Sequence, residues 1–346
     1  MYRPHLLPFL AVALLPLTFS CDRKPDVAHA AGSTQVQELR GNQGRGTLDE
    51  TGAKAGQGAN DEKNQDEKNQ DAKGQQDKGG KGAEKAAADE TGFSRFVETG
   101  KLAGRFETSI VSYKDAKGRQ VDLVAAVHIA DNAYYKDLQK RMEAYDALLY
   151  ELVAAKGTVP EKGRKSSSII SQFQRFLKRG LELDFQLDAI DYKRENFVHA
   201  DLSPTEFKKK QEERGETLVG IMLRSMIKGM QDEKEGKGSK VTILHIIAGF
   251  FAKDQARYHK FLFAQELTRM EEMLASFGDA KGAESTIIGD RNAACFAVLD
   301  QQLAKGKKKI GIFYGAAHLP DMESRLLAKG FKKTGTVWLT AWDLQK

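Results

Sequence analysis

Cysteine, proline and tryptophan are scarce in this chain, which has 2, 7 and 2 of them among 346 residues. Because Cys21 falls in a segment that we expect to be processed, Cys295 is the only thiol left to the folded part, which excludes a disulfide framework. Long apolar runs are missing as well, since residues 6–19 and 241–251 fall short of the ~20 residues of a transmembrane helix. An ordinary apolar core must therefore stabilise the folded part.

The N-terminal segment has the features of an export signal. Residues 6–19 have the length of a signal-peptide core, and residues 17–20, Leu-Thr-Phe-Ser, followed by Cys21 resemble a bacterial lipobox. We therefore predict a signal peptide at residues 1–21 and a lipid anchor on Cys21. The protein would then be an exported lipoprotein of the bacterial cell envelope, attached to the membrane and facing the periplasm. A cut after the small-residue site at 28–30 is the alternative, and it would release a soluble secreted protein.

A low-complexity segment follows at residues 22–90. It has almost no large apolar side chains, and Asp-Glu-Lys-Asn-Gln at 61–65 is repeated at 66–70. Such a segment buries too little surface to offset its conformational entropy, so we predict a disordered linker. A single folded domain is expected at residues 91–346.

The charge balance argues against a nucleic-acid partner. The net charge of +6 is small against 54 basic and 48 acidic residues. The basic clusters at 208–210 and 307–309 have no interleaved aromatic residues and belong to no nucleic-acid-binding motif. We expect a peptide or a small molecule as the partner, and no nucleic acid.

Apolar periodicity predicts an α/β fold. It has a central mixed, largely parallel sheet with flanking helices, and a helical insertion or cap at about residues 160–285. The expected insertion includes residues 241–251 as a buried helix. Strands are expected at 106–113 and 121–127 as a hairpin, and at 147–153, 285–289, 310–314 and 334–340. Helices are expected at 132–145, with Asp131 as N-cap, at 290–304, and through Leu326.

Two predicted strands each end in a histidine. His128 follows the strand at 121–127, and His318 follows the strand at 310–314 after the small residues Gly315-Ala316-Ala317. The carboxyl ends of parallel strands line the ligand crevice of an open α/β sheet, so the two imidazoles are expected to share a site. Each could instead only cap the helix that follows it.

Glu151 is an acidic residue near the end of an apolar strand, where a carboxylate is costly unless it is paired or binds a metal. We expect its strand to lie beside that of His128, because consecutive strands are commonly neighbours. His128, Glu151 and His318 would then form a mixed-ligand site for a divalent ion. The alternative is a salt bridge from Glu151 to Arg291.

Further candidates are Arg291, His199 and Asp201. Arg291 stands at the start of a predicted helix and could bind a substrate carboxylate or a developing oxyanion, or could only clamp Glu151. His199 could transfer protons at the site. Asp201, like Ser203, could be no more than the N-cap of the next helix.

These motifs together resemble the TraB/PrgY/GumN family, which includes the TIKI-type proteins. The resemblance rests on the two strand-to-histidine motifs, on Tyr150-Glu151-Leu152, on Gly289-Asp290-Arg291-Asn292 and on the segment from Gly315 to Pro320. It implies the fold of the erythromycin esterase and ChaN-like group. TIKI-type members are described as divalent-metal-dependent proteases with two Gly-x-x-His motifs and an acidic residue. The resemblance thus implies that His128, Glu151 and His318 are metal ligands, although Ala125 stands where the first motif has glycine.

The expected function is that of an envelope-anchored, divalent-metal-dependent hydrolase acting on peptide bonds, with Mn, Co or Zn as the ion. In this reading Arg291, His199 and Asp201 assist the chemistry. The alternatives are a non-catalytic lipoprotein that binds a peptide or haem, and a scaffold whose histidines only cap helices.

Overall fold

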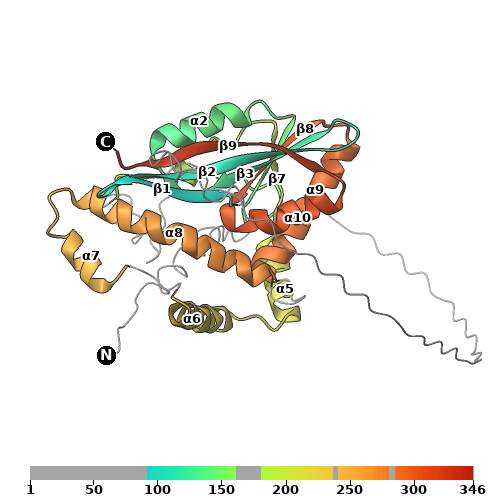
Figure 1. The fold of residues 1–346 in the computed structure, drawn as a ribbon. Helices are drawn as coiled ribbons and strands as arrows, with labels where there is room; N and C mark the ends of the chain where they lie inside the picture. The colour runs from blue at the N-terminus through green and yellow to red at the C-terminus, as the bar shows by residue number, and fades with distance from the viewer. Residues whose placement is uncertain (1–91, 161–180, 237–240, 280–284, 346) are drawn as a thin grey trace, which may run out of the picture. The chain divides into compact units, whose positions relative to one another are not determined.

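The computed structural model describes residues 92–160, 181–236, 241–279 and 285–345. The predicted signal peptide, the linker and the part of the helical insertion at 161–180 lie outside the described residues. The described residues form an α/β fold with one mixed sheet and helices on its two faces, which confirms the expected fold class (Figure 1).

The sheet divides into an antiparallel part and a parallel part. β2 pairs antiparallel with β1, β3 and β9, whereas β3, β8, β5 and β7 are parallel neighbours in that order. β4 and β6 form a separate antiparallel pair. The strands are β1 (Ser94–Gly100), β2 (Ala103–Lys114), β3 (Gln120–Ala126), β4 (Ile129–Ala130), β5 (Ala147–Tyr150), β6 (Asp184–Phe185), β7 (Phe197–His199), β8 (Lys309–Gly315) and β9 (Lys332–Asp343).

All the helices of the described residues lie between these strands in the sequence. The predicted hairpin, the strands at 310–314 and 334–340, and the helices at 132–145, 290–304 and through Leu326 are all confirmed. The helices are α2 (Asn132–Met142), α4 (Gln186–Ala189), α5 (Pro204–Glu213), α6 (Leu218–Lys234), α7 (Ile243–Gly249), α8 (Gln255–Asp279), the π-helix η2 (Thr286–Asp290), α9 (Arg291–Ala304), the 3-10 turn η3 (Ala316–His318) and α10 (Leu319–Ala328).

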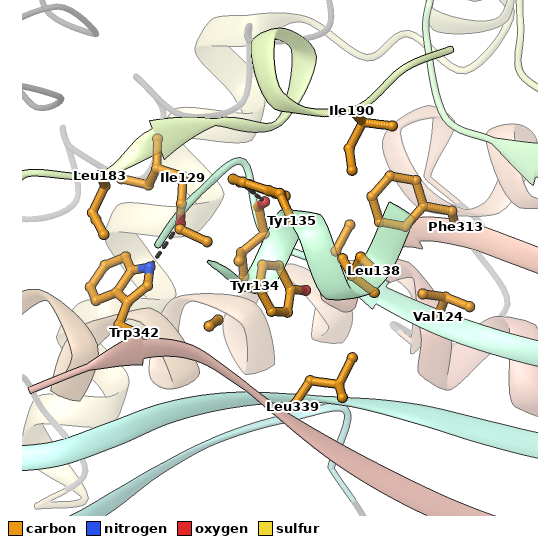
Figure 2. Close-up of a cluster of buried hydrophobic side chains, with 14 of the residues drawn as sticks. Val124, Ile129, Tyr134, Tyr135, Leu138, Leu183, Ile190, Phe313, Leu339 and Trp342 are labelled. Atoms are coloured by element: carbon orange, nitrogen blue, oxygen red, sulfur yellow. Dashed lines mark hydrogen bonds between the residues drawn. The ribbon is translucent and has the colours of Figure 1, made fainter. Parts of the chain in front are cut away.

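The central strands read as continuous apolar runs because both of their faces are buried. On β8, Phe313 packs with one apolar cluster, while Ile312 and Tyr314 pack with the other. Figure 2 shows the first cluster, where α2 and β9 contribute and Trp342 Nε1 donates to the Ile129 carbonyl at 2.8 Å. In the second cluster, α9 and α10 pack against residues of β2, β3, β5 and β8. This two-sided burial fixes the carboxyl ends of the parallel strands.

The fold differs from the prediction in three ways that matter for the site. Residues 285–289 are not a strand but lead into η2, because the Ser285 hydroxyl accepts from the Ile288 N–H and starts a helical turn. β7 was not expected at all, and it extends the parallel part beyond β5. β5 does not lie beside β3, since β8 is inserted between them. β8, which leads to His318, therefore lies between β3, which precedes His128, and β5, which precedes Glu151.

Residues 241–251 are not buried as expected. Leu244, Phe250 and Phe251 expose 72%, 52% and 85% of their surface, although Gly249 faces α8 near His259. Apolar composition predicts burial only where a partner element is present, and composition alone does not reveal that partner. Within the part of the chain that the structure describes, no helix is both long enough and apolar enough to cross a bilayer.

Asp131 precedes α2 as predicted, but its side chain does not cap the helix. Its carboxylate instead accepts from the Asp343 N–H at 2.7 Å and from Lys260 Nζ at 3.2 Å. This long-range contact ties the start of α2 to the last strand.

Candidate functional site

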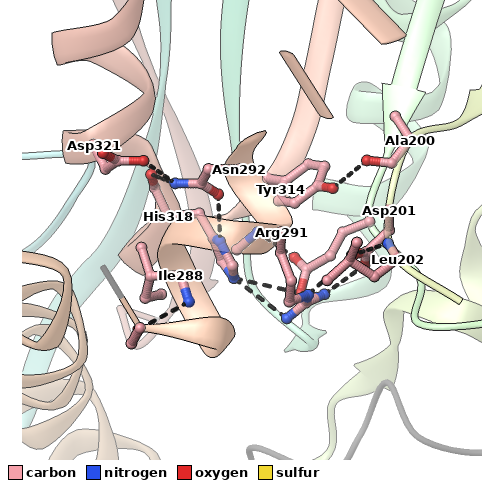
Figure 3. Close-up of polar contacts among 12 residues, drawn as sticks. Ala200, Asp201, Leu202, Ile288, Arg291, Asn292, Tyr314, His318 and Asp321 are labelled. Atoms are coloured by element: carbon pink, nitrogen blue, oxygen red, sulfur yellow. Dashed lines mark hydrogen bonds and ion pairs between the residues drawn. The ribbon is translucent and has the colours of Figure 1, made fainter. Parts of the chain in front are cut away.

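Four polar side chains meet where the parallel strands end. His128 follows β3, His318 follows β8, Glu151 follows β5 and Asp201 follows β7. Arg291, the first residue of α9, lies among them (Figure 3). The expectation that strand ends far apart in sequence converge on one site agrees with this arrangement.

Arg291 is the centre of the cluster. Its Nη2 donates to Glu151 Oε1 at 2.7 Å and to Asp201 Oδ2 at 2.6 Å, and its Nε donates to Asp201 Oδ1 at 3.0 Å. Only 5% of the Arg291 surface is exposed. Burial alone would lower the pKa of the guanidinium, but the Asp201 and Glu151 carboxylates raise it well above its ordinary value. Asp201 is thus the main partner of Arg291 and does not cap α5, which Ser203 does.

Glu151 is held ionised although it is buried. Burial alone would raise the pKa of its carboxyl, but the Arg291 charge, with help from His318, His128 and the Gly315 N–H, lowers the pKa to about 2. The Gly315 N–H donates to Glu151 Oε2 at 2.7 Å. At Gly315 the φ is −52°, so the backbone needs no conformation special to glycine, and the N–H is the group that matters.

His318 is a buried, neutral imidazole at the end of η3. Burial lowers the pKa of its ring to about 4, against the attraction of Glu151. Its Nε2 lies 3.4 Å from Arg291 Nη1 and 3.7 Å from Glu151 Oε1. The ring therefore faces the same ion pair that holds Arg291 in place.

His128 is only half-buried, and it lies near enough to Glu151 and Arg291 for their charges to act on its imidazole. Burial is the main cause that lowers the pKa of its imidazole, and the charge of Arg291 lowers it further. The charge of Glu151 and a hydrogen bond with Gln186 act in the opposite direction. Its carbonyl accepts from the Gln186 N–H at 2.9 Å. The neutral form of the His128 imidazole is thus favoured.

His199 stands apart from these contacts. Its Nε2 forms a 2.6 Å hydrogen bond with the Leu152 carbonyl oxygen, and its ring packs against Tyr150. Tyr150 and His199 are paired across β5 and β7, one residue before Glu151 begins the loop. One of the two ring nitrogens of this proton-transfer candidate is therefore engaged with the backbone.

The arrangement does not fit the expected divalent ion. The three expected ligands are present, but Arg291 takes the Glu151 carboxylate and directs Nη1 at His318 Nε2, so a second cation there would face a guanidinium. Among the described residues, no group of three or more His, Cys, Asp or Glu side chains is placed to hold a metal ion. The ion stays a prediction, and the salt bridge from Glu151 to Arg291 is the interaction seen.

Sequence reasoning assigned no role to Asn292, which is fully buried and contacts both His318 and Asp321. The only signal available was its place directly after Arg291 in the quoted motif. Asn292 is the second residue of α9 and projects to a different side of the helix from Arg291, because successive helical residues point in different directions.

Comparison with protein-family models, with curated proteins and with solved structures finds no match for this chain. The resemblance to the TraB/PrgY/GumN family therefore stays a prediction carried by its short motifs.

The depressed pKa values predict that acid destabilises the fold. Below pH 6.5 the unfolded chain takes up a proton on His318 that the folded protein refuses until about pH 4, so stability falls as pH drops through this window. A gap of roughly 2.5 pH units at about 1.36 kcal/mol each gives a loss of ~3 kcal/mol. Glu151 extends the loss from its ordinary pKa of 4.5 down to about 2.

Urea unfolding of the full chain at pH 7, 5.5 and 4 measures this effect. The variant His318→Gln should lose much of the dependence between pH 6.5 and 4, whereas His245→Gln, at an exposed position, should keep it. Equal unfolding free energies for the unmodified protein at pH 7 and pH 5 would contradict the prediction.

Proposed function

We propose that the protein is a hydrolase of acyl bonds whose reaction centre is the cluster of His128, Glu151, Arg291 and His318. The observation that carries the proposal is one buried guanidinium shared by two carboxylates and facing a neutral imidazole. Burying charges in this way is costly for stability, and such clusters occur preferentially at functional sites.

Arg291 supplies the positive charge for this reaction. An acyl transfer develops negative charge on the carbonyl oxygen, and a donor already fixed in place stabilises it without reorganisation. Arg291 Nη2 and Nε are fully engaged with Glu151 and Asp201, so Nη1 is the donor on the side of His318. The carboxylates hold the guanidinium in position and keep it charged.

His128 supplies the base. A neutral, half-buried imidazole takes a proton from water as the water attacks the acyl carbon, and returns it to the leaving group. Its lowered pKa keeps it unprotonated at neutral pH. A peptide bond is the first substrate class to test, as the family resemblance implies. The envelope location and the lipid anchor predicted from residues 1–21 belong to this proposal as well.

The test uses the purified full chain with a proteome-derived peptide mixture and a panel of carboxylic esters. New termini or released acids, detected by mass spectrometry, are expected from the unmodified protein and are expected to be absent with His318→Gln. Absence of turnover on both substrate sets by a folded protein defeats the proposal. Binding of a peptide or haem without turnover would favour the non-catalytic alternative.

The same preparation decides the role of a metal. Because Arg291 already provides the positive charge, we expect turnover to survive a strong chelator and metal content to be substoichiometric. Loss of turnover on chelation, restored by Mn, Co or Zn, would instead establish the divalent ion that the family resemblance implies.

A further inference from the structure

Asn292 joins the catalytic-site histidine to the start of α10. It is the second residue of α9, has no exposed surface, and makes three side-chain hydrogen bonds (Figure 3). Its Nδ2 donates to the His318 carbonyl oxygen at 3.0 Å and to Asp321 Oδ2 at 2.7 Å. Its Oδ1 lies 2.7 Å from His318 Nδ1.

These contacts fix the orientation of the amide. Both acceptors of Nδ2, a carbonyl oxygen and a carboxylate oxygen, can only accept, so a flipped amide would set oxygen against oxygen twice. Asp321 is itself held by Arg325, whose Nε donates to the same Oδ2 at 2.7 Å. The atom that faces His318 Nδ1 is therefore an oxygen, which cannot donate.

The orientation of the amide determines the tautomer of the ring. A hydrogen bond to Asn292 Oδ1 requires that His318 Nδ1 carries the proton. In a neutral ring Nε2 then holds the lone pair. This agrees with its other neighbour, since Arg291 Nη1 is a donor and lies 3.4 Å from Nε2.

We propose that Asn292 is a positioning residue that, held by Asp321, keeps His318 in its Nδ1–H tautomer and directs the lone pair of Nε2 at Arg291 Nη1. The effect on catalysis rests on the proposed hydrolase function, whereas the tautomer itself does not. The opposite tautomer would place an N–H against the Arg291 N–H groups and disturb the guanidinium that stabilises the developing charge.

The tautomer is measured directly on the full chain. Selective ¹⁵N labelling of histidine and two-bond ¹H–¹⁵N spectra at neutral pH distinguish a protonated Nδ1 from a protonated Nε2 in each ring. Comparison with His318→Gln assigns the resonances of this ring among the 7 histidines. We expect His318 to be protonated at Nδ1 and bare at Nε2. A dominant Nε2–H form in the unmodified protein overturns the proposal, whatever the variants do.

Asn292→Leu removes the amide at nearly constant volume, and it should raise the share of the Nε2–H form. The matched control is Asn196→Leu, because Asn196 also donates two hydrogen bonds from Nδ2, in its case to the carbonyl oxygens of Met142 and Tyr145 at 3.0 and 3.1 Å. The control should lower stability and leave the His318 spectrum unchanged. An unchanged spectrum in a folded Asn292→Leu protein would contradict the proposal.

Kinetics separate this inference from the proposed function. On a substrate that the protein hydrolyses, Asn292→Leu is expected to lower kcat at least about tenfold with little change in KM, because a histidine held in the wrong tautomer impairs the chemical step. Asn196→Leu should leave both constants unchanged. If no substrate is hydrolysed, the proposed function fails, while the spectra still decide the role of Asn292.

Discussion

Replacing Arg291 by methionine is expected to lower the free energy of unfolding by about 3–5 kcal/mol, because it leaves two buried carboxylates without a counter-charge. Glu151 and Asp201 expose only 7% and 6% of their surface, and Arg291 donates to both. Urea denaturation of the full chain measures the loss. Arg291→Lys should recover only part of it, since an ammonium cannot bind Asp201 through two nitrogens as the guanidinium does.

A matched control separates this effect from that of any lost ion pair. Arg214 also binds a carboxylate through two nitrogens, to Asp290 at 2.7 and 2.9 Å, but 29% of its side chain is exposed. We expect Arg214→Met to cost about 1 kcal/mol. Adding Glu151→Gln and Asp201→Asn to Arg291→Met should restore part of the stability, because the unpaired charges are then removed. A cost for Arg291→Met no larger than for Arg214→Met would refute this account.

Replacing His128 by alanine is expected to lower kcat/KM by about 10²–10⁴-fold, the range of a lost general base. The fold should tolerate the change, because His128 is half-buried and the ion pairs of Arg291 do not depend on it. Initial rates on the substrate found in the hydrolysis screen, together with the unfolding midpoint, measure both effects.

His199→Ala is the comparison for this variant. His199 is likewise only part-buried, but its Nε2 is bound to the Leu152 carbonyl, so its loss should change kcat/KM little. Equal losses of activity in the two variants would show that the roles are assigned to the wrong histidine. A large loss with His199→Ala alone would restore the role that the sequence suggested for it.

Local sequence patterns predicted the correct element where a segment's own residues determine its burial. The apolar run at 310–314 predicts a strand, and β8 confirms it, with Phe313 packed on one face of the sheet and Tyr314 on the other. The spacing of Tyr135, Leu138 and Met142 predicts the buried face of α2, and all three are buried. Both outcomes follow from the order of apolar residues within the segment, which the neighbouring elements do not alter.

The same patterns failed where a competing local hydrogen bond or a missing partner surface decides the outcome. Residues 285–289 are apolar enough for a strand, but the Ser285 hydroxyl initiates η2. Residues 241–251 are apolar enough for a buried helix, yet Leu244 and Phe251 are exposed. Periodicity indicates which side of a segment would be buried, but it does not show whether another element is present to cover that side.

By itself the sequence determined the strands β2, β3, β5, β8 and β9 and the side chains that follow three of them, namely two imidazoles and a carboxylate. Only the tertiary structure decided how they are joined. β8 enters between β3 and β5, and Arg291 reaches Glu151 and Asp201 across separations of 140 and 90 residues. The physical reason is that side-chain periodicity is a local property, whereas the pairing of buried charges depends on which strand ends become neighbours.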